Sequence, residues 1–223
     1  MYGETIGETG ETTGGEIRHA PRTLVLACGA LVRELQTITS RHGLALDIEC
    51  LPASLHNRPS LIPGAVRERI ARARRTDPDV RILLGYADCG TGGQLAKVCD
   101  EEGVEMLEGA HCYQFFATNT RFDQLQDDAL GTFYLTDFLV RHFERIVWQG
   151  LGLAEHPELL TDYFGNYTRL VYLAQTDDAS LVSAAERAAE RLGLELSVVT
   201  TGYGELEPAV VEFTRRDSRG SPA

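Results

Sequence analysis

Short apolar runs alternate along this chain with amphipathic stretches of helical period. The first run, 22–28, is rich in strand-forming residues, and the stretch after it places Leu31, Leu35 and Ile38 at helical spacing before Gly43. Similar strand-like runs recur at 44–50, 80–87, 104–109, 169–174 and 194–201. Strands that alternate with helices form parallel sheets wound by right-handed crossovers. The sequence therefore predicts an α/β fold with a mainly parallel, Rossmann-like sheet and helices on both of its faces.

Composition divides the chain into three regions. Residues 1–20 repeat Gly, Glu and Thr without apolar periodicity, so burial cannot offset the cost of ordering them, and a disordered acidic leader is predicted. A single α/β domain is expected over 21–207, and 208–223 is interpreted as a polar C-terminal tail. Within the domain, the stretch 131–152 is predicted to form one long helix, with Thr136 as a candidate N-cap.

The charge balance argues against several classes of partner. The chain carries 33 acidic and 21 basic residues, a formal net charge of −12, so neither nucleic acid nor an anionic membrane surface is an expected partner. The five cysteines are too few and too unevenly spaced for a disulfide framework. No stretch is apolar enough to span a membrane, and the N-terminus lacks the pattern of a secretory signal. We therefore expect a protein of the reducing cytoplasm.

Three cysteines follow predicted strands: Cys28, Cys89 and Cys112. Parallel sheets bind ligands at the carboxyl ends of their strands, so we expect these residues to meet at one edge of the sheet. A thiol at a helix N-terminus is favoured as the thiolate, and flanking glycines let backbone N–H groups approach a bound group. The three cysteines are the predicted metal ligands. The glycines expected to lie close to the bound cofactor are Gly29, Gly90 and Gly92.

Two histidines could serve the same site. His111 directly precedes Cys112, and His56 lies in a proline-rich loop, and both are predicted to act as catalytic residues that handle protons. Three thiolates with a histidine or an open position match zinc, or a [4Fe–4S] cluster that leaves one iron free for substrate. The other two cysteines, Cys50 before the proline-rich loop and Cys99 inside a predicted helix, are left outside the site.

Two other interpretations of these residues stay open. The glycine amides of 89–93, at the start of a predicted helix, could hold a phosphate group, although the stretch lacks the lysine and hydroxyl of a P-loop. Alternatively, Cys28 and Cys89 could act as opposed acid and base thiols, as in cofactor-independent racemases. In that case 117–120 would be a ligand-binding loop.

Several motifs together resemble one family. They are Cys28-Gly29, "LHNRP" with His56, "GYADCG" with Cys89, "AHC" with Cys112, and "GTFYLT" at 131–136. Their combination over about residues 23–205 resembles the family catalogued as domain of unknown function 1638. Its members are often encoded beside corrinoid-dependent methyltransferases. The resemblance therefore implies a role in methyl-group metabolism, with a small-molecule substrate or a corrinoid or methyltransferase protein as partner.

The resemblance points to the same three cysteines and to His56, but the chain departs from the family pattern at one position. Where we expect Tyr-Gly-x-Cys-Gly, this chain has Ala87 between Tyr86 and Asp88. Alanine is disfavoured at positive φ. Either the turn differs here, or the family's glycine is not required by its conformation.

The sequence thus predicts a metal- or iron–sulfur-binding protein with an open coordination position. That position would take a thiol, a methylated nitrogen compound or a corrinoid-linked partner. The rival prediction from another class is an accessory module that docks on a methyltransferase or corrinoid protein and performs no chemistry itself. Its contact surface would be the arginine-rich helix predicted at 67–75.

Overall fold

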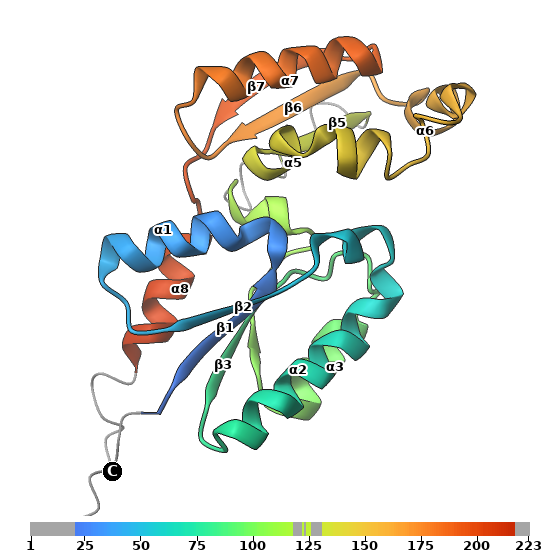
Figure 1. The fold of residues 1–223 in the computed structure, drawn as a ribbon. Helices are drawn as coiled ribbons and strands as arrows, with labels where there is room; N and C mark the ends of the chain where they lie inside the picture. Colours follow the sequence, from blue (N-terminus) through green and yellow to red (C-terminus); the bar gives the residue numbers. More distant parts are fainter. Residues whose placement is uncertain (1–20, 118–121, 123, 126–130, 217–223) are drawn as a thin grey trace, which may run out of the picture.

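The structure, a computed structural model, describes residues 21–117, 122, 124–125 and 131–216 (Figure 1). The predicted leader, 1–20, lies outside the described residues, as does the end of the predicted tail, 217–223. No helix within the described part of the chain is long and apolar enough to cross a membrane.

The first sheet lies in the N-terminal half of the chain. Its strands are β1 (Thr23–Cys28), β2 (Asp47–Leu51), β3 (Arg81–Gly85) and β4 (Glu105–Met106), in the order β2-β1-β3-β4 with every pair parallel. The helices α1 (Val32–His42) and α8 (Leu206–Arg215) lie on one face, and α2 (Ile62–Thr76) and α3 (Gln94–Glu102) on the other (Figure 1). Every residue of β1 is buried, as expected for a central strand covered on both faces.

The second sheet follows later in the chain. Its strands are β5 (Thr132–Thr136), β6 (Arg169–Ala174) and β7 (Glu195–Thr200), in the order β5-β6-β7, again all parallel. The helices α5 (Asp137–Arg141) and α7 (Ala179–Leu192) pack together on one face of this sheet. A π-helical turn at Glu144–Trp148 and the short α6 (Leu160–Phe164) complete this part. Short 3-10 turns lie at Gly29–Leu31, Ala53–Asn57, Pro59–Leu61, Cys112–Phe115 and Pro157–Leu159.

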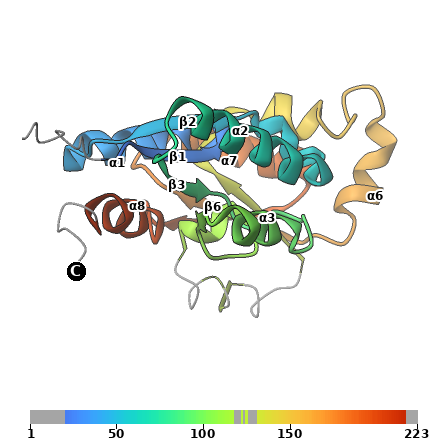
Figure 2. The ribbon, with the colours of Figure 1, turned by 90° about the horizontal axis from the view of Figure 1, so that it is seen from below.

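Each sheet has its own hydrophobic core. We call residues 21–117 together with α8 the first lobe, and 131–200 the second lobe. The helix α8 comes last in the sequence but returns to the first lobe, where Leu206, Val210 and Phe213 join the core of the first sheet. The view from below shows α8 beside α1 on the same side of that sheet (Figure 2).

The predicted α/β class with parallel strands is confirmed, but three details differ from the sequence prediction. The strands form two parallel sheets where one was expected. The expected helix at 131–152 begins with strand β5, and α5 starts only after Thr136, whose hydroxyl accepts a bond from the amide of Leu139 as its N-cap. The predicted polar tail from 208 is wrong as far as 215, because those residues belong to α8 and bury Val210 and Phe213.

Candidate functional site

The ends of adjacent strands bring the three predicted cysteines together. Cys28 is the last residue of β1, which pairs with β3, so Cys28 lies next to the loop that carries Cys89. That loop is bonded to the segment before Cys112: the amide of Asp88 donates to the carbonyl of Gly109 (3.1 Å), and the amide of Cys89 to that of Ala110 (2.9 Å). Cys112 then starts a 3-10 turn. The sequence prediction of one shared edge thus agrees with where these residues lie.

The three thiols shift one another's pKa values. Cys89 and Cys112 are joined by a hydrogen bond between their side chains, which lowers the pKa of the Cys89 thiol to about 7 and raises that of Cys112. Burial, and then the nearby Cys89, raise the pKa of Cys28 to about 11. At neutral pH, Cys89 is therefore the thiol closest to ionisation, and it is the natural nucleophile or first metal ligand of the three.

The three thiols do not form a preformed metal site. Within the described ranges, no group of three or more His, Cys, Asp or Glu side chains is arranged to hold a metal ion. All five cysteines are free. The three form a cluster of thiols, two of them hydrogen-bonded to each other.

The glycine-rich loop after β3 binds its own carboxylate. Asp88 accepts bonds from the amides of Gly92 (3.1 Å) and Gly93 (2.7 Å) and from the hydroxyl of Thr91 (2.7 Å), and these bonds lower its pKa. These donors are the ones a phosphate would need, so the anion-cradle interpretation loses its binding groups. The loop also holds Cys89 at a φ of +49°, which among the described residues is the sole positive φ outside glycine.

The predicted cofactor glycines have visible structural roles. A Cβ at Gly29 would lie 3.0 Å from the carbonyl oxygen of Leu51, so glycine lets the end of β1 pack closely against the end of β2. Gly90 and Gly92 have φ values of +81° and +63°, which favour glycine in this turn. Whether Gly29, Gly90 and Gly92 also approach a cofactor stays a prediction.

Both predicted histidines lie near the thiols. His56 sits in the 3-10 turn Ala53–Asn57, and His111 directly precedes the turn that begins at Cys112. Burial lowers the pKa of both rings, and the nearby His56 lowers that of His111 further. His56 is nevertheless exposed at its outer edge, which places it at the rim of the site. Both imidazoles are neutral at pH 7 and could accept a proton.

A cavity of about 270 Å³ lies between the two lobes beside the thiols. The first lobe contributes Cys28, Ala53, His56, His111, Cys112 and Tyr113 to its wall. The second lobe contributes Phe133, Tyr134, Phe138, Leu139, Ile146 and Tyr167, among others. A larger hollow of about 540 Å³ between β4 and α8 holds none of the predicted site residues, so we take the smaller cavity as the candidate site.

Tyr86 is a buried polar residue in this group that the sequence did not single out. It follows β3 beside Cys28, its side chain is 1% exposed, and its hydroxyl forms no hydrogen bond of ordinary geometry. Burial, and then the neighbouring Cys28, raise its pKa strongly. A buried hydroxyl without a well-formed hydrogen bond normally costs stability, and such groups are concentrated at functional sites.

We expect Tyr86→Phe to change the free energy of unfolding by less than about 1 kcal/mol, because the buried hydroxyl makes no well-formed hydrogen bond and its polar neighbour is the thiol of Cys28. Denaturant unfolding measures this directly. The matched control is Tyr172→Phe, since the Tyr172 hydroxyl donates to Asp137 at 2.7 Å and its loss should lower stability by about 1–3 kcal/mol. Equal losses in the two variants would show that the contact between the Tyr86 hydroxyl and Cys28 is as strong as a well-formed hydrogen bond.

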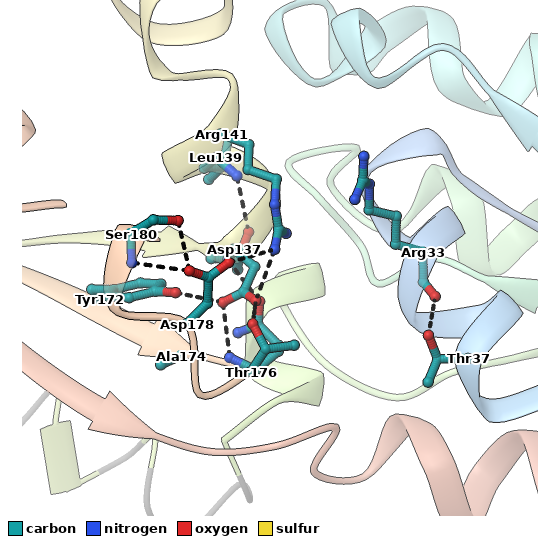
Figure 3. A network of polar contacts seen from close by, with 12 residues as sticks. Arg33, Thr37, Asp137, Leu139, Arg141, Tyr172, Ala174, Thr176, Asp178 and Ser180 are labelled. Carbon is teal, nitrogen blue, oxygen red and sulfur yellow. Dashed lines mark hydrogen bonds and ion pairs between the residues drawn. The ribbon is translucent and has the colours of Figure 1, made fainter. Parts of the chain in front are cut away.

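A polar network lies at the start of α5, close to the cavity (Figure 3). Asp137 is fully buried and accepts bonds from the hydroxyls of Tyr172 (2.7 Å) and Thr176 and from the amide of Gln175 (2.9 Å). Arg141 lies between Asp137 (3.7 Å) and Asp178 (3.9 Å). These bonds fix the end of β5 against the loop after β6, and thereby the second-lobe wall of the cavity.

Most of the sequence matches a known protein family. Residues 50–210, more than half of the chain, match the family described as "Protein of unknown function (DUF1638)". The chain belongs to this family. The DUF1638 match includes His56, Cys89 and Cys112 but begins after Cys28. No curated protein and no solved structure matches the chain.

The backbone at Ala87, where the sequence analysis expected a glycine, is of ordinary conformation. Ala87 is buried and is not among the residues at positive φ; the left-handed residue in this stretch is Cys89. A glycine at 87 is therefore not required by the backbone of this DUF1638 protein. The aromatic wall of the cavity went unnoticed in the sequence, although Tyr113, Phe133 and Tyr134 lie in the same segments as the motifs.

Proposed function

We propose that the protein binds a soft metal centre, zinc or a [4Fe–4S] cluster, through Cys28, Cys89 and Cys112, and takes a small molecule in the adjacent cavity. The observation that carries this proposal is the cluster of three thiols at the carboxyl edge of the first sheet, where Cys28 and Cys112 line the cavity and Cys89 is hydrogen-bonded to Cys112. Three soft sulfur donors suit zinc or iron–sulfur centres better than magnesium or calcium, which prefer oxygen.

Metal binding would change the state of the thiols. A thiol must lose its proton to become a ligand, so binding releases protons and separates the hydrogen-bonded pair Cys89 and Cys112. Bound there, the metal would supply Lewis-acid or soft-ligand chemistry to a substrate. His56 and His111, both neutral and at the same wall, would accept or return the substrate's proton.

The proposal places this chemistry in methyl-group metabolism, in a reducing cytoplasm that keeps the cysteines free. Support for this pathway comes from the resemblance to a family whose members are often encoded beside corrinoid-dependent methyltransferases. The size of the cavity limits the substrate, because about 270 Å³ cannot enclose a corrinoid ring. A corrinoid or methyltransferase protein would therefore present a small group to the cavity and rest on its rim.

Metal analysis tests the proposal. We expect protein purified anaerobically without chelator, or reconstituted with zinc or with iron and sulfide, to hold about one zinc or about four irons per chain. Cys89→Ser should lower this metal content at least tenfold. The matched control is Cys99→Ser, because Cys99 is equally buried but lies in α3, away from the site. Substoichiometric metal in reduced wild-type protein would count against the metal centre.

A metal-free thiol enzyme is the second candidate. The contact between Cys89 and Cys112 favours it, because two coupled thiols can exchange protons without a metal. The acid and base thiols would then be Cys89 and Cys112, rather than Cys28 and Cys89. This candidate predicts activity that survives chelation and is lost when either thiol is alkylated.

The docking alternative has less support. Four of the five arginines on α2 pair with glutamates of the same chain, Glu49, Glu101 and Glu102. The four are Arg67, Arg69, Arg72 and Arg74. These pairs neutralise most of the positive charge that a docking surface would offer an acidic partner.

A further inference from the structure

We infer that the ligand of the cavity between the lobes is an uncharged small molecule with an apolar body and one polar or soft atom, which faces the thiols and histidines. The inference names the ligand class of the site already proposed. It rests on the proposed function only in taking this cavity as the place where substrate binds.

The part of the cavity wall formed by α5 and the segment after it is apolar. Phe138 and Leu139 from α5, Ile146 and Val147 from the π-helical turn, and Leu151 after it line this side. Removing apolar ligand surface from water against such a wall is favourable by about 25 cal/mol per Å². These side chains offer no hydrogen bonds, so they select the body of the ligand by shape and apolar character.

A column of stacked rings crosses from one lobe to the other. His111 stacks on Tyr113 with centroids 4.9 Å apart and planes 19° apart, and Tyr113 stacks on Tyr134 at 5.3 Å and 17°. All three rings line the cavity. Because the rings stack on one another rather than surround a point, they form a wall beside the ligand and not a cage for a cation.

The thiol and imidazole groups of the wall lie on the first-lobe side. Cys28, Cys112, His56 and His111 lie there, with Asn57 beside them. None of the described residues that line the cavity is Asp, Glu, Lys or Arg. A charged ligand would lose hydration without gaining an ionic partner from this wall, and that cost is large.

Strand β5 adds neutral hydrogen-bonding groups to the opposite wall. It is an edge strand of the second sheet, and Thr132, Phe133, Tyr134 and Thr136 all line the cavity. An edge strand carries backbone N–H and C=O groups that the sheet leaves unpaired. Such groups can bind a hydroxyl, carbonyl or amide of an uncharged ligand.

The volume sets an upper limit on ligand size. At about 270 Å³ the cavity lies just below the usual range for small-molecule sites, roughly 300–1,000 Å³. A single-ring or short-chain compound fits this space. A nucleotide does not, which agrees with the occupation of the glycine loop amides by Asp88.

The test uses three probes that share one ring: benzyl alcohol, which is neutral, benzoate, which is an anion, and benzyltrimethylammonium, which is a cation. Binding to the full-length, reduced, metal-free protein is measured by calorimetry and by ligand-observed NMR. We expect benzyl alcohol to bind at least tenfold more tightly than either charged probe. Leu139→Trp and Ile146→Phe, which fill the cavity, should each weaken its binding at least fivefold.

The control variant is Val198→Trp, which adds the same ring at an exposed position on β7 and should leave binding unchanged. Circular dichroism shows whether each variant is folded, and the smaller change, Ile146→Phe, keeps the test valid if Leu139→Trp does not fold. Tighter binding of a charged probe would overturn the inference. Binding of benzyl alcohol that neither cavity variant weakens, or no binding of any probe, would overturn it equally. Metal content is measured separately, so metal binding without probe binding would overturn the inference and leave the proposed function standing.

Discussion

Asp137→Ala is expected to lower the free energy of unfolding by about 3–5 kcal/mol. The Asp137 carboxylate is fully buried, and it accepts bonds from the hydroxyls of Tyr172 and Thr176 and the amide of Gln175. Alanine would leave those donors buried without an acceptor. It would also remove one of the two carboxylates beside Arg141.

The measurement is urea unfolding followed by the fluorescence of Trp148, the one tryptophan of the chain, which lies in the same lobe. Asp137→Asn keeps one acceptor oxygen and should cost less than the alanine variant. The control is Asp178→Ala, because Asp178 caps α7 from a partly exposed position and its loss should cost about 1 kcal/mol. A loss at Asp137 no larger than that at Asp178 would refute the structural role assigned to this network.

The network also explains why the second-lobe wall of the cavity is in place. Asp137 directly follows β5, whose residues line the cavity, and its partners belong to β6 and the loop after it. A milder destabilisation by Asp137→Asn should therefore weaken ligand binding as well. Stability and the shape of the site are linked through one buried carboxylate.

The sequence was sufficient to find the thiol edge because parallel strands all end on one side of a sheet. Cys28 and Cys89 follow β1 and β3, which are neighbours, so strand periodicity alone placed them together. Cys112 was placed by the same rule, although the contact that brings it to Cys89 is the bonding of 88–89 to 109–110. Such loop pairing leaves no periodic pattern in the sequence.

The division into two sheets could not be predicted in the same way. Strand β5 runs into α5 with no Gly or Pro between them, and Thr136 both ends the strand and caps the helix. Apolar residues of helical spacing therefore seemed to continue back through the strand. The return of α8 was missed because 208–223 was interpreted as a polar tail, although Pro208 is tolerated in the first turn of a helix and Val210 and Phe213 are buried.

The cavity exists because the chain forms two sheets and not one. It forms where β5 and α5 of the second lobe face the cysteine-bearing turns of the first, so neither lobe's sequence pattern contains it. The glycine-rich loop after β3 is the opposite case, because there the sequence suggested a ligand site that the loop fills with its own side chain. Its composition suggested an anion site, but the carboxylate that its amides bind is Asp88 of the loop itself.

Cys89 is expected to react with iodoacetamide about a hundredfold faster than Cys28 at pH 7. The two are similarly buried, at 7% and 8% exposure, and Cys28 also lines the cavity, so access does not favour Cys89. Cys89, with a pKa of about 7, is a thiolate in about half of the molecules at this pH. Cys28, with a pKa of about 11, is a thiolate in roughly one molecule in ten thousand. A less basic thiolate is also a weaker nucleophile, which reduces the advantage to about a hundredfold.

The alkylation rates of both cysteines should rise with pH. Deprotonation creates the nucleophile, so the Cys89 rate should rise about tenfold per pH unit below 7 and level off above it, while the Cys28 rate should still be rising at pH 9. Peptide mass spectrometry of chelator-treated protein follows both sites in one sample. Cys112→Ala removes the hydrogen bond that favours the Cys89 thiolate, so it should move the Cys89 profile to higher pH, whereas Cys99→Ala should not. Equal rates at the two cysteines, or a Cys89 profile unmoved by Cys112→Ala, would show that this thiol pair does not favour the Cys89 thiolate, and the metal-free mechanism would lose its base.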